Sequence, residues 1–263
     1  MAEDFLSGLL KYPIYFLWLM SSLCAGQALP QPVLTLVTGD MVAGFYHSPE
    51  QTGIVDNILA EALRRMGYGL KVLTVPTQRS LQMSASGLAD GELLRTPAIE
   101  AGFPTLLRVP EPLVTGEFVV FSREPFDVQD AWESLAGKSV GIIIGMKIIE
   151  KKVPKSARIS RVKNETQLFS LLVKKRIDYA VFLRDIGLYH LNKSNIKGVV
   201  INVMPLETIP AYVYLNPKHA ALVPRLTRAL REMKRDGTFQ EMIEQHLQPL
   251  MRGSAVQGVE VGR

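Results

Sequence analysis

The sequence contains a single cysteine in 263 residues, and that residue, Cys24, lies in an N-terminal segment that we predict to be removed. A mature chain without thiols has no disulfide and no thiolate metal site, and it is not an enzyme with a cysteine nucleophile. Histidine is also scarce, and the four histidines do not follow a metal-ligand spacing: His47, His190, His219 and His246. We therefore predict no metal site.

Motifs of known catalytic and phosphate-binding sites are missing as well. Gly137-Lys138-Ser139 resembles the end of a phosphate-binding loop, but Trp132 stands where the first glycine of that loop is required. The triplet also precedes a predicted strand instead of a helix. No serine lies in a G-x-S-x-G nucleophile elbow. The sequence therefore predicts neither an enzyme nor a cofactor.

The apolar run at residues 14–23 is too short to span a membrane. Lys11 precedes it, and the small-x-small sequence Gly26-Gln27-Ala28 follows it, which is typical of a secretory signal peptide. We predict that residues 1–28 are a signal peptide, cleaved after Ala28, and that the mature protein is periplasmic.

Two further features of this segment concern an alternative to the signal peptide and the possibility of a lipid anchor. Glu3 and Asp4 make its start acidic, so a buried N-terminal helix is the alternative interpretation. Cys24 follows Leu23, with Ser21 three residues before the cysteine, whereas a lipoprotein signal needs a small residue and a leucine at those two places. We therefore predict no lipid anchor.

The net charge is +5, and removal of residues 1–28 raises it to +6, so a nucleic-acid partner has to be considered. The densest basic runs are residues 147–155, 174–176 and 225–235. In the last two runs the charges lie on the polar faces or ends of amphipathic helices, and no aromatic residues are interleaved for base stacking. We interpret the runs as solvated faces and predict no nucleic-acid partner.

The first half of the chain alternates between strand and helix patterns. Apolar residues recur along one side of a helix at 54–65, and Pro76 separates the next strand from a helix that ends at Gly87. The predicted order is strand 34–38, helix 54–65, strand 70–75, helix 78–86 and strand 90–94. This β-α-β-α-β order is typical of an α/β sheet.

The segment 132–189 shows the same alternation. Residues 140–144 are an unbroken apolar run with Gly145 after it, as expected of a strand that is buried on both faces of a parallel sheet. A helix over 166–174 and a strand over 177–183 follow, so the segment predicts a β-α-β unit. The turn after its first strand lies at the carboxyl edge of the sheet, where open α/β folds bind their ligands.

Three blocks of sequence carry a family resemblance. They read SLAGKSVGIIIG, ETQLFSLLVKKRIDYAV and LTRALREMKRDGTFQEMIEQH, and in the last block Asp236-Gly237-Thr238 separates two amphipathic helices. GIVD at 53–56 and SGLAD at 86–90 are looser matches in the same order. The chain resembles extracellular solute-binding proteins of family 3, the periplasmic receptors best known from amino-acid ABC transporters, over residues 34–246.

The resemblance implies an α/β fold of the two-lobed periplasmic-binding-protein type II. In this fold each lobe is a mixed sheet flanked by helices, and two hinge strands join the lobes. Residues 118–122 and 211–215 are extended runs at the expected places of the hinges. The implied lobe one is 29–117 plus 211–250, and lobe two is 118–210. The aperiodic segment 251–263 is predicted to be a disordered tail.

Residues that hold an α-amino acid in the resembling family are not retained. Alignment on Pro112 places Phe103 where an arginine for the α-carboxylate is expected, and alignment on Asp178 places Leu183 where an aspartate for the ammonium is expected. Met146 replaces a serine or threonine after the strand-end glycine. These departures argue against a standard α-amino acid as ligand.

Other residues supply the candidate ligand contacts. Arg95 follows a predicted strand, so its guanidinium is expected to bind a carboxylate or phosphate in the cleft, and an ion pair with Glu92 or Glu100 is the alternative. Arg184 and Asp185 hold the corresponding edge in lobe two, where Asp185 is also expected to act as a helix N-cap. The remaining candidates are Phe45 and Tyr46 after the first strand, and Glu92, Met146 and Lys147.

The expected function is capture of a small anionic or polar ligand in an interlobe cleft for an ABC transporter. The protein is expected to be a monomer, with a permease or a membrane sensor as its partner. One alternative is a ligand-sensing or accessory protein without a dedicated permease. Another is an enzyme on the same fold, as in cyclohexadienyl dehydratases, with Glu92 or Asp185 as its acid or base.

Overall fold

The computed structural model describes residues 31–39 and 44–253, with side chains up to residue 248. The predicted signal peptide lies outside the described residues, as does the tail from residue 254 onward. The helices and strands are β1 (Val33–Thr38), α2 (Ile54–Arg65), β2 (Gly69–Thr74), α3 (Thr77–Ser86), β3 (Gly91–Arg95), η3 (Pro97–Ala101), β4 (Leu107–Arg108), β5 (Val114–Ser122), η4 (Ala131–Leu135), β6 (Ser139–Ile143), α4 (Lys147–Lys152), β7 (Arg158–Val162), α5 (Glu165–Val173), β8 (Tyr179–Leu183), α6 (Arg184–Lys193), β9 (Val200–Ile201), β10 (Glu207–Leu215), η5 (Pro217–His219), α7 (Leu222–Arg235) and α8 (Thr238–Gly253).

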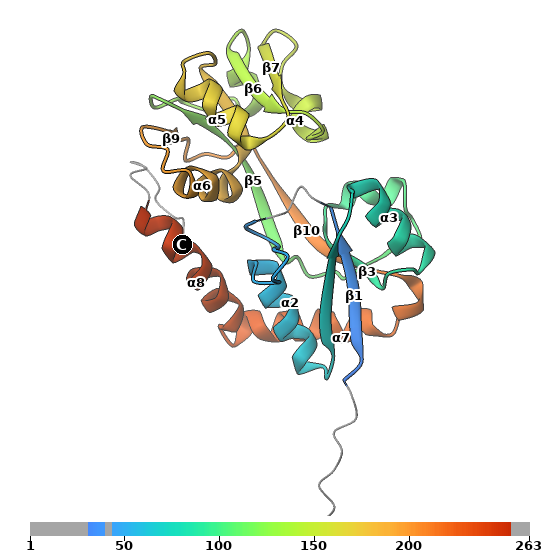
Figure 1. Cartoon of the computed structure of the whole chain (residues 1–263). Helices are drawn as coiled ribbons and strands as arrows, with labels where there is room; N and C mark the ends of the chain where they lie inside the picture. Colours follow the sequence, from blue (N-terminus) through green and yellow to red (C-terminus); the bar gives the residue numbers. More distant parts are fainter. Residues whose placement is uncertain (1–30, 40–43, 254–263) are drawn as a thin grey trace, which may run out of the picture. The chain divides into compact units, whose positions relative to one another are not determined.

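The strands of the described residues follow the order β2-β1-β3-β10-β5-β8-β6-β7, with β4 paired to β10 and β9 to β5. β1 lies parallel to both β2 and β3, and β6 lies parallel to both β7 and β8. β10 is antiparallel to its partners and is shared: its residues 207–211 pair with β5, and Tyr212 to Leu215 pair with β3. Figure 1 shows β5 and β10 as the long strands between the two sets of parallel strands.

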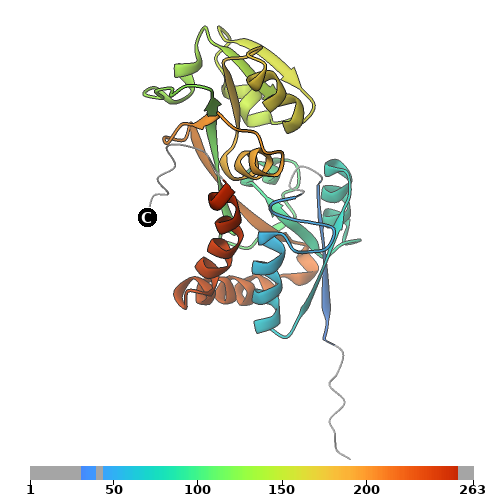
Figure 2. The same ribbon diagram turned by 60° about the vertical axis from the view of Figure 1, so that its left-hand side comes forward.

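The periodic segments fold as predicted. α2 has the predicted bounds, with Asp56 in its first turn and buried apolar residues along one face. α3 ends where Gly87 adopts a left-handed conformation with φ of 82°, which a side chain on Cβ disfavours. α7 and α8 are separated at Gly237, whose φ is 87°. Figure 2 shows these two helices as consecutive, differently directed elements.

The segment after β6 differs from the predicted β-α-β unit. α4 and β7 lie between β6 and α5, so the unit has the order β6-α4-β7-α5-β8. The strand β7 reads RISRV and is only partly buried, because it is the last strand of the sheet. Its charged residues obscured the strand pattern in the sequence. β6 itself is buried, as predicted.

Close backbone contacts hold the shared strand against β3. A Cβ atom on Gly91 would lie 2.1 Å from the backbone oxygen of Tyr214, so only glycine permits this approach. Tyr214 itself is fully buried, and its hydroxyl donates a hydrogen bond of 2.7 Å to Glu100. This contact lies at the start of β3, and at the end of the strand Arg95 pairs with Tyr212 of β10.

Candidate ligand-binding site

Arg95 is the last residue of β3 and forms an ion pair with Glu92. Its Nε donates to Glu92 Oε2 over 2.7 Å, and one terminal nitrogen donates to Ser80 Oγ over 2.6 Å. The same terminal nitrogen lies 3.2 Å from the point where a Cβ on Gly39 would stand, so the guanidinium lies beside the first residue after β1. The ion pair that sequence analysis gave as the alternative role is therefore present.

Glu92 is fully buried and is the acceptor at the centre of this group. Burial raises the pKa of its carboxyl, while the Arg95 guanidinium and the hydroxyls of Ser80 and Ser84 act in the opposite direction. The Ser84 hydroxyl donates to Glu92 over 3.3 Å. The carboxylate is therefore enclosed, and the Arg95 guanidinium is the part of the pair at the carboxyl end of β3.

Phe45 and Tyr46 lie in the segment that enters α2, and both are buried in the apolar core. The ring of Phe45 lies 6.1 Å from that of Tyr189 on α6, measured between centroids. The Tyr46 hydroxyl donates to Asp185 Oδ2 over 3.4 Å. These residues therefore join the segment after β1 to α6, and their side chains are mostly covered.

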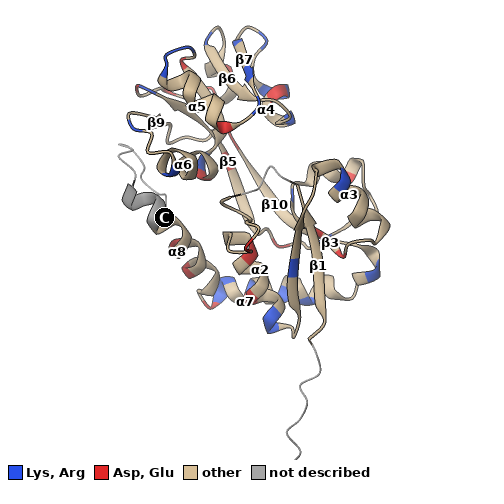
Figure 3. Ribbon diagram, viewed as in Figure 1, with Lys and Arg blue, Asp and Glu red and all other residues tan. Residues whose placement is uncertain are grey.

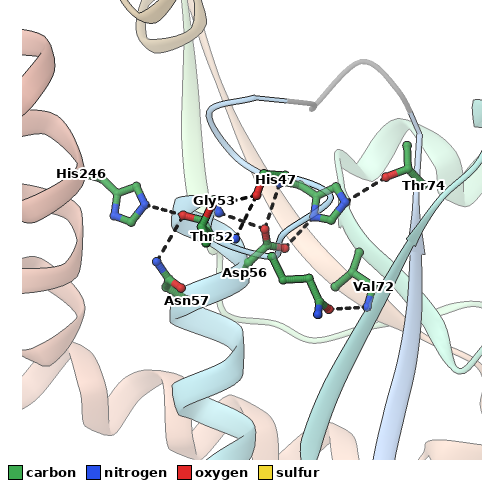
Figure 4. Close-up of polar contacts among 10 residues, drawn as sticks. His47, Thr52, Gly53, Asp56, Asn57, Val72, Thr74 and His246 are labelled. Carbon is green, nitrogen blue, oxygen red and sulfur yellow. Dashed lines mark hydrogen bonds and ion pairs between the residues drawn. The ribbon is translucent and has the colours of Figure 1, made fainter.

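A buried polar network holds this segment in place. His47 Nδ1 lies 2.7 Å from Asp56 Oδ1, and its Nε2 lies 2.9 Å from the Thr74 hydroxyl at the end of β2. The second carboxylate oxygen of Asp56 accepts from the backbone amides of Ser48 and Gly53, over 3.1 and 3.0 Å. Figure 4 shows His47 between the helix α2 and the strand β2, with Asp56 on one side and Thr74 on the other. The network was not predicted from the sequence.

Arg184 and Asp185 begin α6. Arg184 Nε donates to Glu117 of β5, and a terminal nitrogen donates to the Val203 carbonyl oxygen over 2.8 Å. The prediction that Asp185 caps the helix is wrong, because Leu183 is the N-cap and Asp185 already lies in the first helical turn. An acidic residue there still interacts favourably with the helix dipole.

Burial raises the pKa of the Asp185 carboxyl, and the negative charge of Glu117 raises it further. Burial also raises the pKa of Tyr46, together with the charge of Asp185, so the phenol remains protonated and donates to the carboxylate. Arg184 therefore pairs with Glu117, and its charge acts on the neighbouring Asp185 carboxyl as well. Glu117 was not among the predicted site residues, although a lone carboxylate in the apolar run VTGEFVVF was a usable signal.

Met146 and Lys147 lie apart from both groups. Met146 is buried in the core at the N-cap of α4, with no side-chain cap hydrogen bond. The Lys147 ammonium contacts Glu150 over 2.9 Å and is 84% exposed. The structure therefore brings the predicted residues into two main groups, Glu92 with Arg95 and Tyr46 with Arg184 and Asp185. Figure 3 shows the acidic and basic positions along these elements.

We expect Asp185→Asn to change the pH dependence of stability. A raised pKa means that the folded state binds the Asp185 proton more tightly than the unfolded state does. The stability that this proton contributes is complete at low pH and is lost as pH rises through the raised pKa of the folded state. The asparagine variant lacks this loss. The melting temperature of the variant minus that of wild type should therefore be larger at about pH 7 than at about pH 4.

The exposed residue Asp127 provides the matched control. Asp127→Asn should leave the difference from wild type nearly independent of pH. The burial argument is contradicted if Asp185→Asn loses stability relative to wild type as pH rises from about 4 to about 7.

The described part of the chain has no group of three or more His, Cys, Asp or Glu residues that could hold a metal ion. Within the same residues, none of the helices combines the length and the apolar character that crossing a membrane requires.

Comparison with known proteins identifies the fold. A scan against models of protein families found no match. One relative is an uncharacterized protein of Shewanella oneidensis, 25% identical over 234 residues, which are 84% of this chain and 88% of the relative.

Two solved structures illustrate the likeness. The ligand-binding core of GluR0 in complex with L-glutamate is 15% identical, covers 82% of this chain and 98% of its own, and has a TM-score of 0.67. An ancestral amino-acid-binding protein, a precursor of cyclohexadienyl dehydratase, is 19% identical with a TM-score of 0.60, over 81% of this chain and 94% of its own. The chain has the α/β fold of these amino-acid-binding proteins, which confirms the predicted fold class.

Proposed function

We propose that the protein is a periplasmic solute-binding protein that captures a small anionic or polar ligand and presents it to an ABC transporter. The observation that carries the proposal is the fold, shared over about four fifths of the chain with proteins that bind amino acids. Because one fold can serve different functions, the residues at the strand ends have to supply the rest of the argument. Export depends on the proposed signal peptide at residues 1–28.

Ligand capture requires two lobes that close, and β5 and β10 are suited to be the hinges. The change of partner along β10 supports a lobe boundary at 210/211, because the strand leaves β5 and joins β3 immediately after Ala211. The other proposed boundary, 117/118, lies inside β5. Lobe one is then 29–117 plus 211–250, and lobe two is 118–210. A ligand that contacts both lobes selects the closed state.

The strand ends supply the ligand contacts in this proposal. On the lobe-one side Arg95 offers guanidinium donors and is held by the buried Glu92. On the other side Arg184 pairs with Glu117, and Asp185 follows it in the first turn of α6. Both arginines lie beside carboxylates, so these positions suit a polar ligand better than an apolar one. Tyr46 and Phe45 lie where the two sides meet, since they contact Asp185 and Tyr189. Lys147, exposed at the start of α4, is proposed as a separate further contact, whereas the buried Met146 side chain packs in the core.

Free α-amino acids are expected to bind weakly. Phe103 is partly buried and packs against an apolar cluster of Leu81, Leu106 and Tyr214, so an apolar ring occupies the position that would need an arginine. Leu183 and Met146 provide no charge or hydroxyl for the ligand. An unpaired carboxylate or ammonium in a closed site loses its hydration without compensation. The expected ligand is therefore a different polar molecule, such as an organic anion.

Native mass spectrometry tests this function. Protein purified from the periplasm without denaturation should carry a bound solute, seen as added mass that disappears on denaturation. Calorimetry with the identified solute should then give a dissociation constant well below millimolar, while the common amino acids should bind no more tightly than about millimolar. Absence of any bound solute, together with no binding from a panel of organic anions and amino acids, would contradict the proposal.

A further inference from the structure

A basic groove runs along α7, away from the strand ends described above. Its volume is about 740 Å3. Its lining consists of one helix face and the short segment before β5: Pro110, Glu111, Val223, Pro224, Thr227, Arg228, Arg231, Lys234 and Arg235. Four of these side chains are cationic and one is anionic, so the groove has a net charge of +3. Figure 3 shows the basic positions on α7 in blue.

The single carboxylate neutralises only part of this charge. Glu111 accepts from Arg231 Nε over 2.9 Å and from Lys234 Nζ over 2.7 Å. Lys234 also donates to the Pro112 carbonyl oxygen over 2.8 Å, and its ammonium lies 4.8 Å from the centroid of the Phe239 ring. Lys234 is therefore held by the protein itself.

Arg228 and Arg235 are the available cations. Within the described residues Arg228 has no hydrogen bond or ion pair, and Arg235 contacts Glu232 only at 3.8 Å. Arg228, Arg231 and Arg235 follow one another at i+3 and i+4 spacing on the exposed face of α7. Like charges at this spacing weaken a helix unless an anion lies between them, so the stripe is suited to an anionic partner.

We propose that this groove binds an acidic segment of a partner protein. Bidentate contacts from Arg228 and Arg235 fit the carboxylates of Asp or Glu side chains. Val223, Pro110 and Pro224 supply apolar walls that fit an aliphatic side chain between the carboxylates. Among the described residues, no aromatic one lines the groove for stacking with nucleic-acid bases. The proposal is independent of the ligand at the strand ends.

The test uses the full mature chain and a fluorescein-labelled synthetic peptide in which glutamates alternate with leucines. Fluorescence anisotropy should show saturable binding that weakens as salt increases. Arg228→Glu with Arg235→Glu should weaken binding at least about tenfold. Both positions are exposed, so this variant should still fold, with a melting temperature close to that of wild type.

Lys151→Glu with Lys155→Glu is the matched control, since it makes the same change in net charge at two exposed positions in and after α4. The control should bind the acidic peptide as wild type does, and a peptide with glutamine in place of glutamate should not bind. The proposal is overturned if the acidic peptide does not bind, if both double variants lose affinity equally, or if the groove variant keeps full affinity. Binding to phosphatidylglycerol vesicles or to single-stranded DNA without binding to the peptide would overturn it as well.

Discussion

Asp56→Ala should lower the free energy of unfolding by about 3 to 5 kcal/mol. The Asp56 side chain is fully buried and is the common acceptor for His47 Nδ1 and for the backbone amides of Ser48 and Gly53. Its removal leaves the buried donors of His47 and Gly53 without an acceptor, and the partly buried Ser48 amide as well. Each buried unpaired donor costs about 1 to 3 kcal/mol. Urea unfolding of the mature chain measures the change.

Glu61→Ala is the control on the same helix. Glu61 pairs with Arg64, whose side chain is 68% exposed, and with Arg65, whose side chain is 24% exposed. Both pairs lie at the surface of one helix, so their removal should cost no more than about 1 kcal/mol. Equal losses for the two variants would contradict the role of the buried network. The network also positions Tyr46, so Asp56→Ala should weaken binding of any ligand that contacts the segment after β1.

Arg95→Ala should also lower the free energy of unfolding by about 3 to 5 kcal/mol, measured without ligand. The reason is Glu92, which is fully buried and whose main cationic partner is Arg95 at 2.7 Å. Removing the guanidinium leaves the buried carboxylate with the Ser84 hydroxyl as a donor but without its cationic partner. A stability close to wild type would contradict this account of the pair.

The double variant Glu92→Gln with Arg95→Gln separates the structural role from ligand binding. Because both charges are removed together, it should be clearly more stable than Arg95→Ala. If Arg95 also holds an anionic ligand, the folded double variant should lose affinity for that ligand by about 2 to 4 kcal/mol. Retained affinity would assign Arg95 to the stability of the fold alone.

The helices and most strands were predictable because their causes are local. A helix such as α2 is specified by apolar residues at its own 3.6-residue period, and Gly87 and Gly237 end or separate helices through backbone conformations that favour glycine. These patterns need no knowledge of distant residues. α4 and β7 escaped prediction because α4 is short and β7, at the edge of the sheet, lacks a clear apolar alternation.

The candidate site was only partly predictable, because most of its contacts join residues that are far apart in the sequence. The pair of Glu92 and Arg95 is three residues apart in one strand, so the sequence could offer it as an alternative. Tyr46 and Asp185 are 139 residues apart, and Arg184 and Glu117 are 67 apart. No local pattern records such contacts.

The sequence by itself determined the α/β class, the order of its main helices and strands, and the strand ends that carry polar residues. The tertiary structure decided which of those ends meet and how far each charge is compensated. In the structure β10 is shared between two sets of strands. The side chains of Phe45, Tyr46 and His47 are buried, which their position in a predicted loop did not indicate. The physical reason is that periodicity acts within one element, whereas burial and ion pairing depend on which elements pack together.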